Sequence, residues 1–183
     1  MNKIVSLFRS KCSSGQFEQL MSSHIDGLFR QAYHYTGSHA DAEDLLQDLL
    51  ASLYPRINEL KSIEKLQPWL LRCLYNRFVD NYRKKQRLPE TENIDDPAIF
   101  NDIPARTPAE TVRVQVEINR ALHTLTPSQR AVVCLHDIEG YSLPELVDTL
   151  EQPLGTLKSH LHRARSQLKK QLELQPFTEL ERL

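Results

Sequence analysis

The chain has 183 residues, with 23 basic and 24 acidic side chains and a formal net charge of −1 at pH 7. This length accommodates one ordinary domain or two small ones, and the balanced charge argues against a uniformly basic nucleic-acid-binding protein. No apolar stretch approaches the 18 residues of a transmembrane helix, so we expect a soluble protein without direct membrane insertion. Glycine is scarce (5 residues), and apolar residues recur at spacings of three and four, which is typical of an all-α fold.

The first clear helix is predicted from Asp41 to Tyr54, with Ser38 as its N-cap. Its apolar residues fall on one continuous face at i, i+3, i+4, i+7, i+8 and i+11. They are Ala42, Leu45, Leu46, Leu49, Leu50 and Leu53. The other side carries Asp41, Asp44, Gln47 and Asp48. This acidic face is either an ordinary solvated surface or a docking site for a basic partner.

A second helix is predicted after Pro68, from Trp69 to about Gln86. Its apolar side is expected to be buried and consists of Leu70, Leu71, Leu74, Tyr75, Phe78 and Tyr82. At 100° per residue, a largely basic stripe clusters on the opposite side. It consists of Arg72, Asn76, Asp80, Arg83 and Arg87, and it continues into Lys84 and Lys85. Arginine and lysine hold phosphates and an amide reads a base edge, so this stripe is either a nucleic-acid surface or a solvated positive face.

The middle of the chain is different in composition. Residues 88–111 hold six acidic groups, one basic group and four prolines, and no amphipathic pattern survives there. Such a composition predicts a flexible acidic linker between two small helical domains. The expected organisation is an N-terminal extension (1–14), a first domain (15–87), the linker (88–111), a second domain (112–173) and a C-terminal tail (174–183).

Two capping boxes organise the second domain. Thr126-Pro127-Ser128-Gln129 opens a helix that runs to about His136, and Ser142-Leu143-Pro144-Glu145 opens a short helix that ends near Leu150. A three-residue turn, Glu151-Gln152-Pro153, leads into a long basic helix that ends at about Leu172. A short helix, a tight turn and a long basic helix together form the helix-turn-helix layout.

The long helix has an apolar seam and a polar stripe. The seam is predicted to consist of Leu154, Leu157, Leu161, Ala164, Leu168 and Leu172. The stripe consists of Lys158, His162, Arg165 and Lys169, flanked by Ser159 and Arg163. Residues 152–172 hold five basic groups and no acid, so little would repel phosphate. The pattern favours DNA binding over a merely solvated helix.

Nothing in the sequence points to a metal, a cofactor or a catalytic centre. Cys12, Cys73 and Cys134 are far apart without a CxxC pair, which indicates reduced thiols in a cytoplasmic protein. None of the seven histidines lies at metal-ligand spacing from a cysteine. A phosphate-processing enzyme is therefore a weak alternative, since no glycine-rich phosphate loop or nucleophile–base pattern occurs.

From about Gln16 to Leu172 these segments resemble the extracytoplasmic-function (ECF) sigma factors of the sigma-70 family. Residues 41–48 resemble region 2.2, which in that family docks on the clamp helices of the RNA polymerase β′ subunit; the matched positions are Asp44, Gln47 and Asp48. The segment 69–77 resembles regions 2.3 and 2.4, which open the minus-10 promoter element. Asn76 matches the position that lines the family's pocket for a flipped-out base, and the basic run from Arg83 to Arg87 completes the region, with a specificity loop at about 60–67. The residues expected to contact the minus-10 element are Arg72, Asn76, Arg83, Lys84, Lys85 and Arg87.

The motif of the C-terminal half resembles region 4.2, whose recognition helix reads the minus-35 element. The matched positions are Lys158, Ser159, His162 and Arg163, and the family usually has glycine in the turn where this chain has Glu151 or Gln152. The resemblance implies binding to RNA polymerase core (β′ and β subunits) and to promoter DNA, control by an anti-sigma factor, and a role in a stress or envelope response. A free-standing helix-turn-helix regulator is the alternative; it leaves helices 41–54 and 69–86 without a role.

Overall fold

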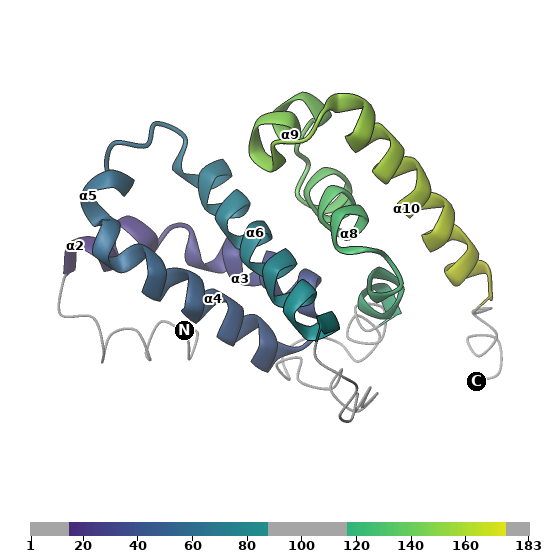
Figure 1. Cartoon of the computed structure of the whole chain (residues 1–183), viewed down its shortest axis with the longest axis horizontal. Helices are drawn as coiled ribbons and strands as arrows, with labels where there is room; N and C mark the ends of the chain where they lie inside the picture. Colours follow the sequence, from purple (N-terminus) through teal and green to yellow (C-terminus); the bar gives the residue numbers. More distant parts are fainter. Residues whose placement is uncertain (1–14, 88–116, 175–183) are drawn as a thin grey trace, which may run out of the picture. The chain divides into compact units, whose positions relative to one another are not determined.

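A computed structural model describes residues 15–87 and 117–174, and every regular element within these two ranges is a helix. The chain divides into two compact units, which we call the N-terminal unit (15–87) and the C-terminal unit (117–174) (Figure 1). The predicted all-α fold with two helical domains is confirmed. Three predicted segments lie outside the described residues: the extension (1–14), the linker (88–111) and the tail after its first residue (175–183). The exact domain limits therefore stay predictions.

The N-terminal unit is built on three long helices that pack side by side, α3 (Ile25–Thr36), α4 (His39–Leu53) and α6 (Leu66–Arg87) (Figure 1). The short helices α2 (Gly15–Met21) and α5 (Ile57–Leu60) lie together at one end, and a 3-10 turn (Tyr54–Arg56) joins α4 to α5.

The core of this unit is the apolar face of α4, and the sequence-based prediction of that face is confirmed. All six predicted side chains are at most 3% exposed, because α3 and α6 cover them. The N-cap is also confirmed, since the hydroxyl of Ser38 accepts a hydrogen bond from the N–H of Asp41 at 3.3 Å. Gly37 ends α3 with a φ of 71°, a left-handed conformation that glycine adopts without a steric penalty. The chain therefore reverses within two residues and starts α4.

Helix α6 starts at Leu66, three residues before the predicted start. Pro68 lies inside its first turn, where a missing N–H removes no intrahelical hydrogen bond. The predicted specificity loop of 60–67 is correspondingly shorter, because Leu60 ends α5 and Leu66 begins α6.

The predicted apolar side of α6 is buried from Leu70 to Phe78, but the prediction for Tyr82 is wrong. The Tyr82 side chain is 39% exposed, and residues 83–87 are all exposed as well. The end of α6 therefore extends beyond the packed core of the N-terminal unit.

The C-terminal unit contains a helical segment (117–123), α8 (Pro127–Val133), α9 (Leu143–Leu150) and α10 (Leu154–Leu174) (Figure 1). A π-helical turn, Cys134–Ile138, continues α8 in place of the plain α-helix that we predicted to His136. Both predicted capping boxes are present with reciprocal hydrogen bonds, one from Thr126 to Gln129 and one from Ser142 to Glu145. Local sequence thus defines where α8 and α9 begin.

The helix-turn-helix consists of α9, the turn and α10, as predicted. Glu151 ends α9 in the left-handed region with a φ of 51° and is the only non-glycine residue with positive φ in the described ranges. The family's usual glycine would adopt this conformation without strain. Glu151 therefore bears a steric cost that glycine would not bear.

The predicted apolar seam of α10 is correct in its middle and wrong at its ends. Leu157, Leu161 and Ala164 are at most 6% exposed, whereas Leu154 and Leu172 are 39% and 44% exposed. The middle of the seam packs on α8 and α9. These helices have 7 and 8 residues against 21 in α10, so they are too short to cover its full length.

A buried arginine completes the core of the C-terminal unit. The side chain of Arg130 in α8 is 5% exposed and donates to three backbone carbonyls at and just after the end of the 117–123 segment: those of Leu122 (2.9 Å), His123 (3.0 Å) and Leu125 (3.3 Å). Carbonyls at a helix C-terminus lack intrahelical partners and carry partial negative charge, so they suit a guanidinium. Arg130 thus fixes the first helical segment of this unit to α8.

Candidate nucleic-acid interface

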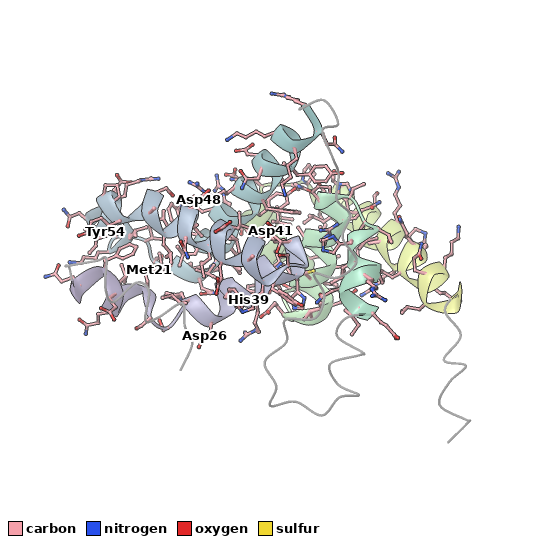
Figure 2. All side chains as sticks on the ribbon, turned by 90° about the horizontal axis from the view of Figure 1, so that it is seen from below. Met21, Asp26, His39, Asp41, Asp48 and Tyr54 are labelled. Carbon is pink, nitrogen blue, oxygen red and sulfur yellow. The ribbon has the colours of Figure 1, made fainter. Side chains whose placement is uncertain are left out.

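The acidic side of α4 faces away from the core, as its sequence predicts. Asp44 and Asp48 are exposed, and Gln47 is half-buried. Figure 2 shows Asp41 and Asp48 along the same helix. The Asp48 carboxylate also lies 3.7 Å from a guanidinium nitrogen of Arg77, so part of its charge is balanced by α6. Sequence reasoning missed Arg77, because the crossing of α4 and α6 is a tertiary feature that leaves no periodic signal.

The polar side of α6 runs from the core of the unit to its projecting end. Arg72 is half-buried, Asn76 is exposed, and the last turn brings together four exposed cations. They are Arg83, Lys84, Lys85 and Arg87. These charges also interact favourably with the partial negative charge at the C-terminus of a helix. Because nothing within the unit covers this end, it presents a compact basic surface.

The start of α6 holds a second cluster that the sequence did not reveal. The guanidinium of Arg56 lies 5.8 Å from the ring centre of Trp69, and it donates two hydrogen bonds to Glu59 (2.8 and 3.0 Å). Cys73, one helical turn beyond the tryptophan, is half-buried, and burial raises the pKa of its thiol. Trp69 is thus held as a half-buried packing residue beside the short loop before α6.

In the C-terminal unit, all four predicted contact residues of α10 are exposed and lie in its first half. They are Lys158, Ser159, His162 and Arg163. The Ser159 hydroxyl donates to the carbonyl of Gly155 at 2.9 Å, which leaves its oxygen lone pairs as acceptors. Between these residues, burial and then the charge of Arg163 lower the pKa of His160, so that His160 is neutral at pH 7. Lys158 and Arg163 give this surface its permanent positive charge.

Two side-chain contacts flank the buried seam of α10. On one flank, Arg165 donates to Asp137 of the π-helical turn, from Nε at 3.1 Å and from Nη2 at 2.5 Å. On the other flank, the Gln167 amide donates to the carbonyl of Thr124 at 2.7 Å. Arg165 belongs to the stripe predicted from the sequence, but its partner was not foreseen. These contacts join α10 to the π-helical turn on one side and to Thr124, the residue after the 117–123 segment, on the other.

Residues 15–87 and 117–174 contain neither a metal-binding cluster nor a membrane-spanning helix. No group of three or more histidine, cysteine or acidic side chains there could hold a metal ion. None of the helices in this part of the chain is both long and apolar enough to cross a bilayer. Cys134 is fully buried, and burial raises the pKa of its thiol to about 12, which makes it unreactive.

Comparison with protein-family models gives two matches that together cover both units. Residues 20–88 match sigma-70 region 2, and residues 115–168 match sigma-70 region 4. The first match covers α3, α4 and α6, and the second covers the helix-turn-helix.

Similar curated proteins carry the same description. The ECF RNA polymerase sigma factor SigE of Mycolicibacterium smegmatis is 34% identical over 163 residues, which are 84% of this chain and 60% of that protein. SigW of Bacillus subtilis is 28% identical and aligns with 85% of this chain and 88% of its own length. SigM of Mycobacterium tuberculosis is 30% identical, over 83% of this chain and 74% of its own length.

Among solved structures, the sigma factor RpoE in complex with the anti-sigma factor NepR from Bartonella quintana is similar with a TM-score of 0.66. The two chains are 28% identical, and the match covers 88% of this chain and 99% of RpoE. CnrH, solved in complex with the cytosolic domain of CnrY, has a TM-score of 0.62 at 21% identity, which supports the fold. Members of this family are transcription initiation factors and not enzymes. With both characteristic regions in place, the chain belongs to the ECF sigma factors of the sigma-70 family.

Proposed function

We propose that this chain binds RNA polymerase core through α4 and directs it to promoters with two DNA contacts, the minus-10 element through α6 and the minus-35 element through α10. The observation that carries the proposal is the separation of charge on exposed helices. One acidic surface and one basic surface belong to the N-terminal unit, and a second basic surface belongs to the C-terminal unit. A free-standing helix-turn-helix regulator would need only the last of these.

The polymerase contact is assigned to Asp44, Gln47 and Asp48. Their side chains face outward from a helix whose opposite face is fully buried, so α4 can accept a partner without disturbing the core. Exposed carboxylates attract a basic surface and steer its approach. The matched family region supports the β′ clamp helices as the partner.

The minus-10 contact is assigned to the exposed side and projecting end of α6. Lysine and arginine side chains there would hold phosphates, which fix register without reading sequence. The amide of Asn76, exposed one turn before Asp80, is the group on this face that would read an unpaired base by hydrogen bonds. Arg72 is half-buried and is assigned a supporting phosphate contact at the edge of the surface.

The minus-35 contact is assigned to the first half of α10. In helix-turn-helix proteins the N-terminal residues of the second helix meet base edges in the major groove. Arg163 offers a planar guanidinium that can bind guanine with two hydrogen bonds, Lys158 offers a point charge, and His162 and Ser159 offer further hydrogen-bonding groups.

Each DNA surface is small, so neither unit alone should bind a promoter tightly. The polymerase would hold both at a fixed separation and so turn two weak contacts into one specific interaction. All nucleotide chemistry would belong to the polymerase.

The regulation and location of the protein follow from the same proposal. The similar RpoE was solved with an anti-sigma factor, which supports an anti-sigma partner for this chain too. Release from that partner would connect transcription to a stress or envelope signal. A protein that works on the polymerase would act in the cytoplasm.

Run-off transcription with purified core polymerase tests the proposal. The wild-type chain should give defined start sites that core polymerase alone does not give. Asp44→Arg and Asp48→Arg should abolish copurification with core, while Asp26→Arg, an exposed acidic residue on α3, should leave it intact. If the chain neither binds core nor confers selective initiation, the proposal is wrong, and a surviving operator-binding activity would indicate the free-standing regulator.

Promoter opening is tested separately with Asn76→Ala. We expect this variant to bind promoter DNA in the closed form but to show weaker permanganate reactivity of thymines near the start site. A permanganate pattern identical to that of the wild type would reject the role of Asn76.

A further inference from the structure

The strongest unassigned feature of the C-terminal unit is the contact between Arg165 and Asp137. Arg165 lies on the same stripe of α10 as Lys158 and His162, at i+7 and i+3 from them. Its guanidinium is nevertheless bound to a carboxylate 28 positions earlier in the chain, which the π-helical turn presents to it. The two donors, Nε and Nη2, each meet a different carboxylate oxygen of Asp137. Arginine also uses this bidentate arrangement to bind phosphate.

The pair contributes little to folding. The Arg165 and Asp137 side chains are 56% and 30% exposed, and ion pairs near the surface typically contribute about 0.2–1 kcal/mol. The buried seam already packs α10 on α8 and α9, and Arg130 holds α8 against the 117–123 segment. The larger effect of Asp137 is therefore on what else Arg165 can bind.

We propose that Asp137 competes with DNA phosphate for Arg165 and so limits the sequence-independent affinity of the recognition helix. The carboxylate occupies the same donors that would bind a phosphate, and its negative charge would repel a phosphate that approached Arg165. The proposed minus-35 contact residues remain available to DNA; they are Lys158, Ser159, His162 and Arg163. The binding free energy therefore comes more from base contacts and less from phosphate contacts. Asp137 is thus a specificity-determining residue that does not touch a base.

The salt dependence of DNA binding provides a quantitative test of this proposal. Each phosphate contact steepens the dependence of log affinity on log salt concentration by about 0.9. A variant in which Arg165 gains a phosphate should therefore bind tighter at low salt, and its advantage should shrink by roughly threefold between 50 and 200 mM salt.

The inference rests on the proposed function of α10, and the experiment keeps the two apart. Holoenzyme reconstituted from core polymerase and the full chain is titrated onto two promoter duplexes, one intact and one with a scrambled minus-35 element. We compare the wild type with Asp137→Asn, Arg165→Gln and the double variant. Asp137→Asn keeps the shape of the side chain and removes its charge, and thermal melting of each variant checks that the unit still folds.

We expect Asp137→Asn to tighten binding to both duplexes, to lower the preference for the intact element and to steepen the salt dependence. Arg165→Gln should leave binding unchanged, and the double variant should lose the gain of Asp137→Asn. If Asp137→Asn binds no tighter, or if Arg165→Gln alone weakens binding, Arg165 is not withheld from DNA and the inference is wrong. If the wild type shows no preference for the intact element, the proposed role of α10 fails instead.

Discussion

The carboxylate of Asp48 lies 3.7 Å from the guanidinium of Arg77 and so joins the proposed polymerase-binding helix, α4, to the proposed minus-10 helix, α6. The two side chains are 64% and 32% exposed, respectively, which places the pair among surface ion pairs of small energetic value. Asp48 therefore has two separable roles, a structural one toward Arg77 and a proposed one toward the polymerase.

A charge swap separates the two roles. Asp48→Arg places two cations together and should lower the stability of the N-terminal unit by up to about 1 kcal/mol. The double variant Asp48→Arg/Arg77→Asp restores the ion pair and should recover that stability, as measured by thermal melting. It should still fail to copurify with core polymerase, because the outward charge on α4 stays reversed. Recovery of polymerase binding together with stability would mean that Asp48 acts only through the fold.

Phe78 and Tyr82 lie one turn apart on α6, and we expect very different losses of stability when each is removed. Phe78 is 7% exposed and stacks on Tyr35 of α3 with ring centres 4.8 Å apart, whereas Tyr82 is 39% exposed. Phe78→Ala should destabilise the N-terminal unit by about 3–5 kcal/mol, since it leaves a cavity between α3 and α6. Tyr82→Ala should cost less than about 1 kcal/mol. Urea denaturation measures the free energy of unfolding of both variants. Equal losses of this free energy would show that a further segment covers Tyr82.

Local sequence was sufficient to predict much of this fold. The apolar face of α4 was predicted in full because its period keeps all six side chains on one stripe. The N-caps of α4, α8 and α9 were recognised because an N-cap involves only neighbouring residues, although α4 begins at His39 and not at the predicted Asp41. The exposure of the candidate site residues, apart from the half-buried Gln47 and Arg72, followed from the same periodicity, although their roles stay predictions.

The sequence could not predict where the neighbouring helices that cover an apolar stripe end. Tyr82, Leu154 and Leu172 continue an apolar period, yet each lies beyond the helices that cover the rest of its stripe. Contacts across the fold were also invisible, because 28 positions separate Arg165 from Asp137 and no spacing rule links them.

The left-handed Glu151 gives a prediction about stability. Glu151→Gly should stabilise the C-terminal unit by about 0.5–1 kcal/mol, because glycine adopts positive φ without the clash that a Cβ causes. Glu151→Ala is the matched control: it removes the same carboxylate but keeps the Cβ, and should not stabilise. Hydrogen exchange of α10 amides measures the effect within this unit. A gain from alanine equal to that from glycine would assign it to the lost carboxylate.

Arg130 should be among the most sensitive positions of the C-terminal unit. Arg130→Met keeps the length of the side chain but leaves the carbonyls of Leu122, His123 and Leu125 without their donor, and we expect a loss of about 2–4 kcal/mol. Arg120→Met, at an exposed position of the 117–123 segment, should change stability by no more than about 0.5 kcal/mol. Hydrogen exchange of the α8 amides measures the stability of both variants. A loss of stability for Arg130→Met as small as that for Arg120→Met would show that solvent can replace the guanidinium.

Arg163 is the α10 residue whose loss should most directly change promoter selection. If its guanidinium reads a base in the minus-35 element, Arg163→Ala should lower discrimination between the correct and a substituted base pair by about 1–3 kcal/mol. Lys170→Ala, exposed two turns further along α10, is the matched control and should leave discrimination unchanged. Competition binding of holoenzyme to a panel of single-base promoter variants measures the effect. A uniform loss of affinity across the whole panel would instead identify Arg163 as a phosphate contact, since a phosphate contact carries no sequence information.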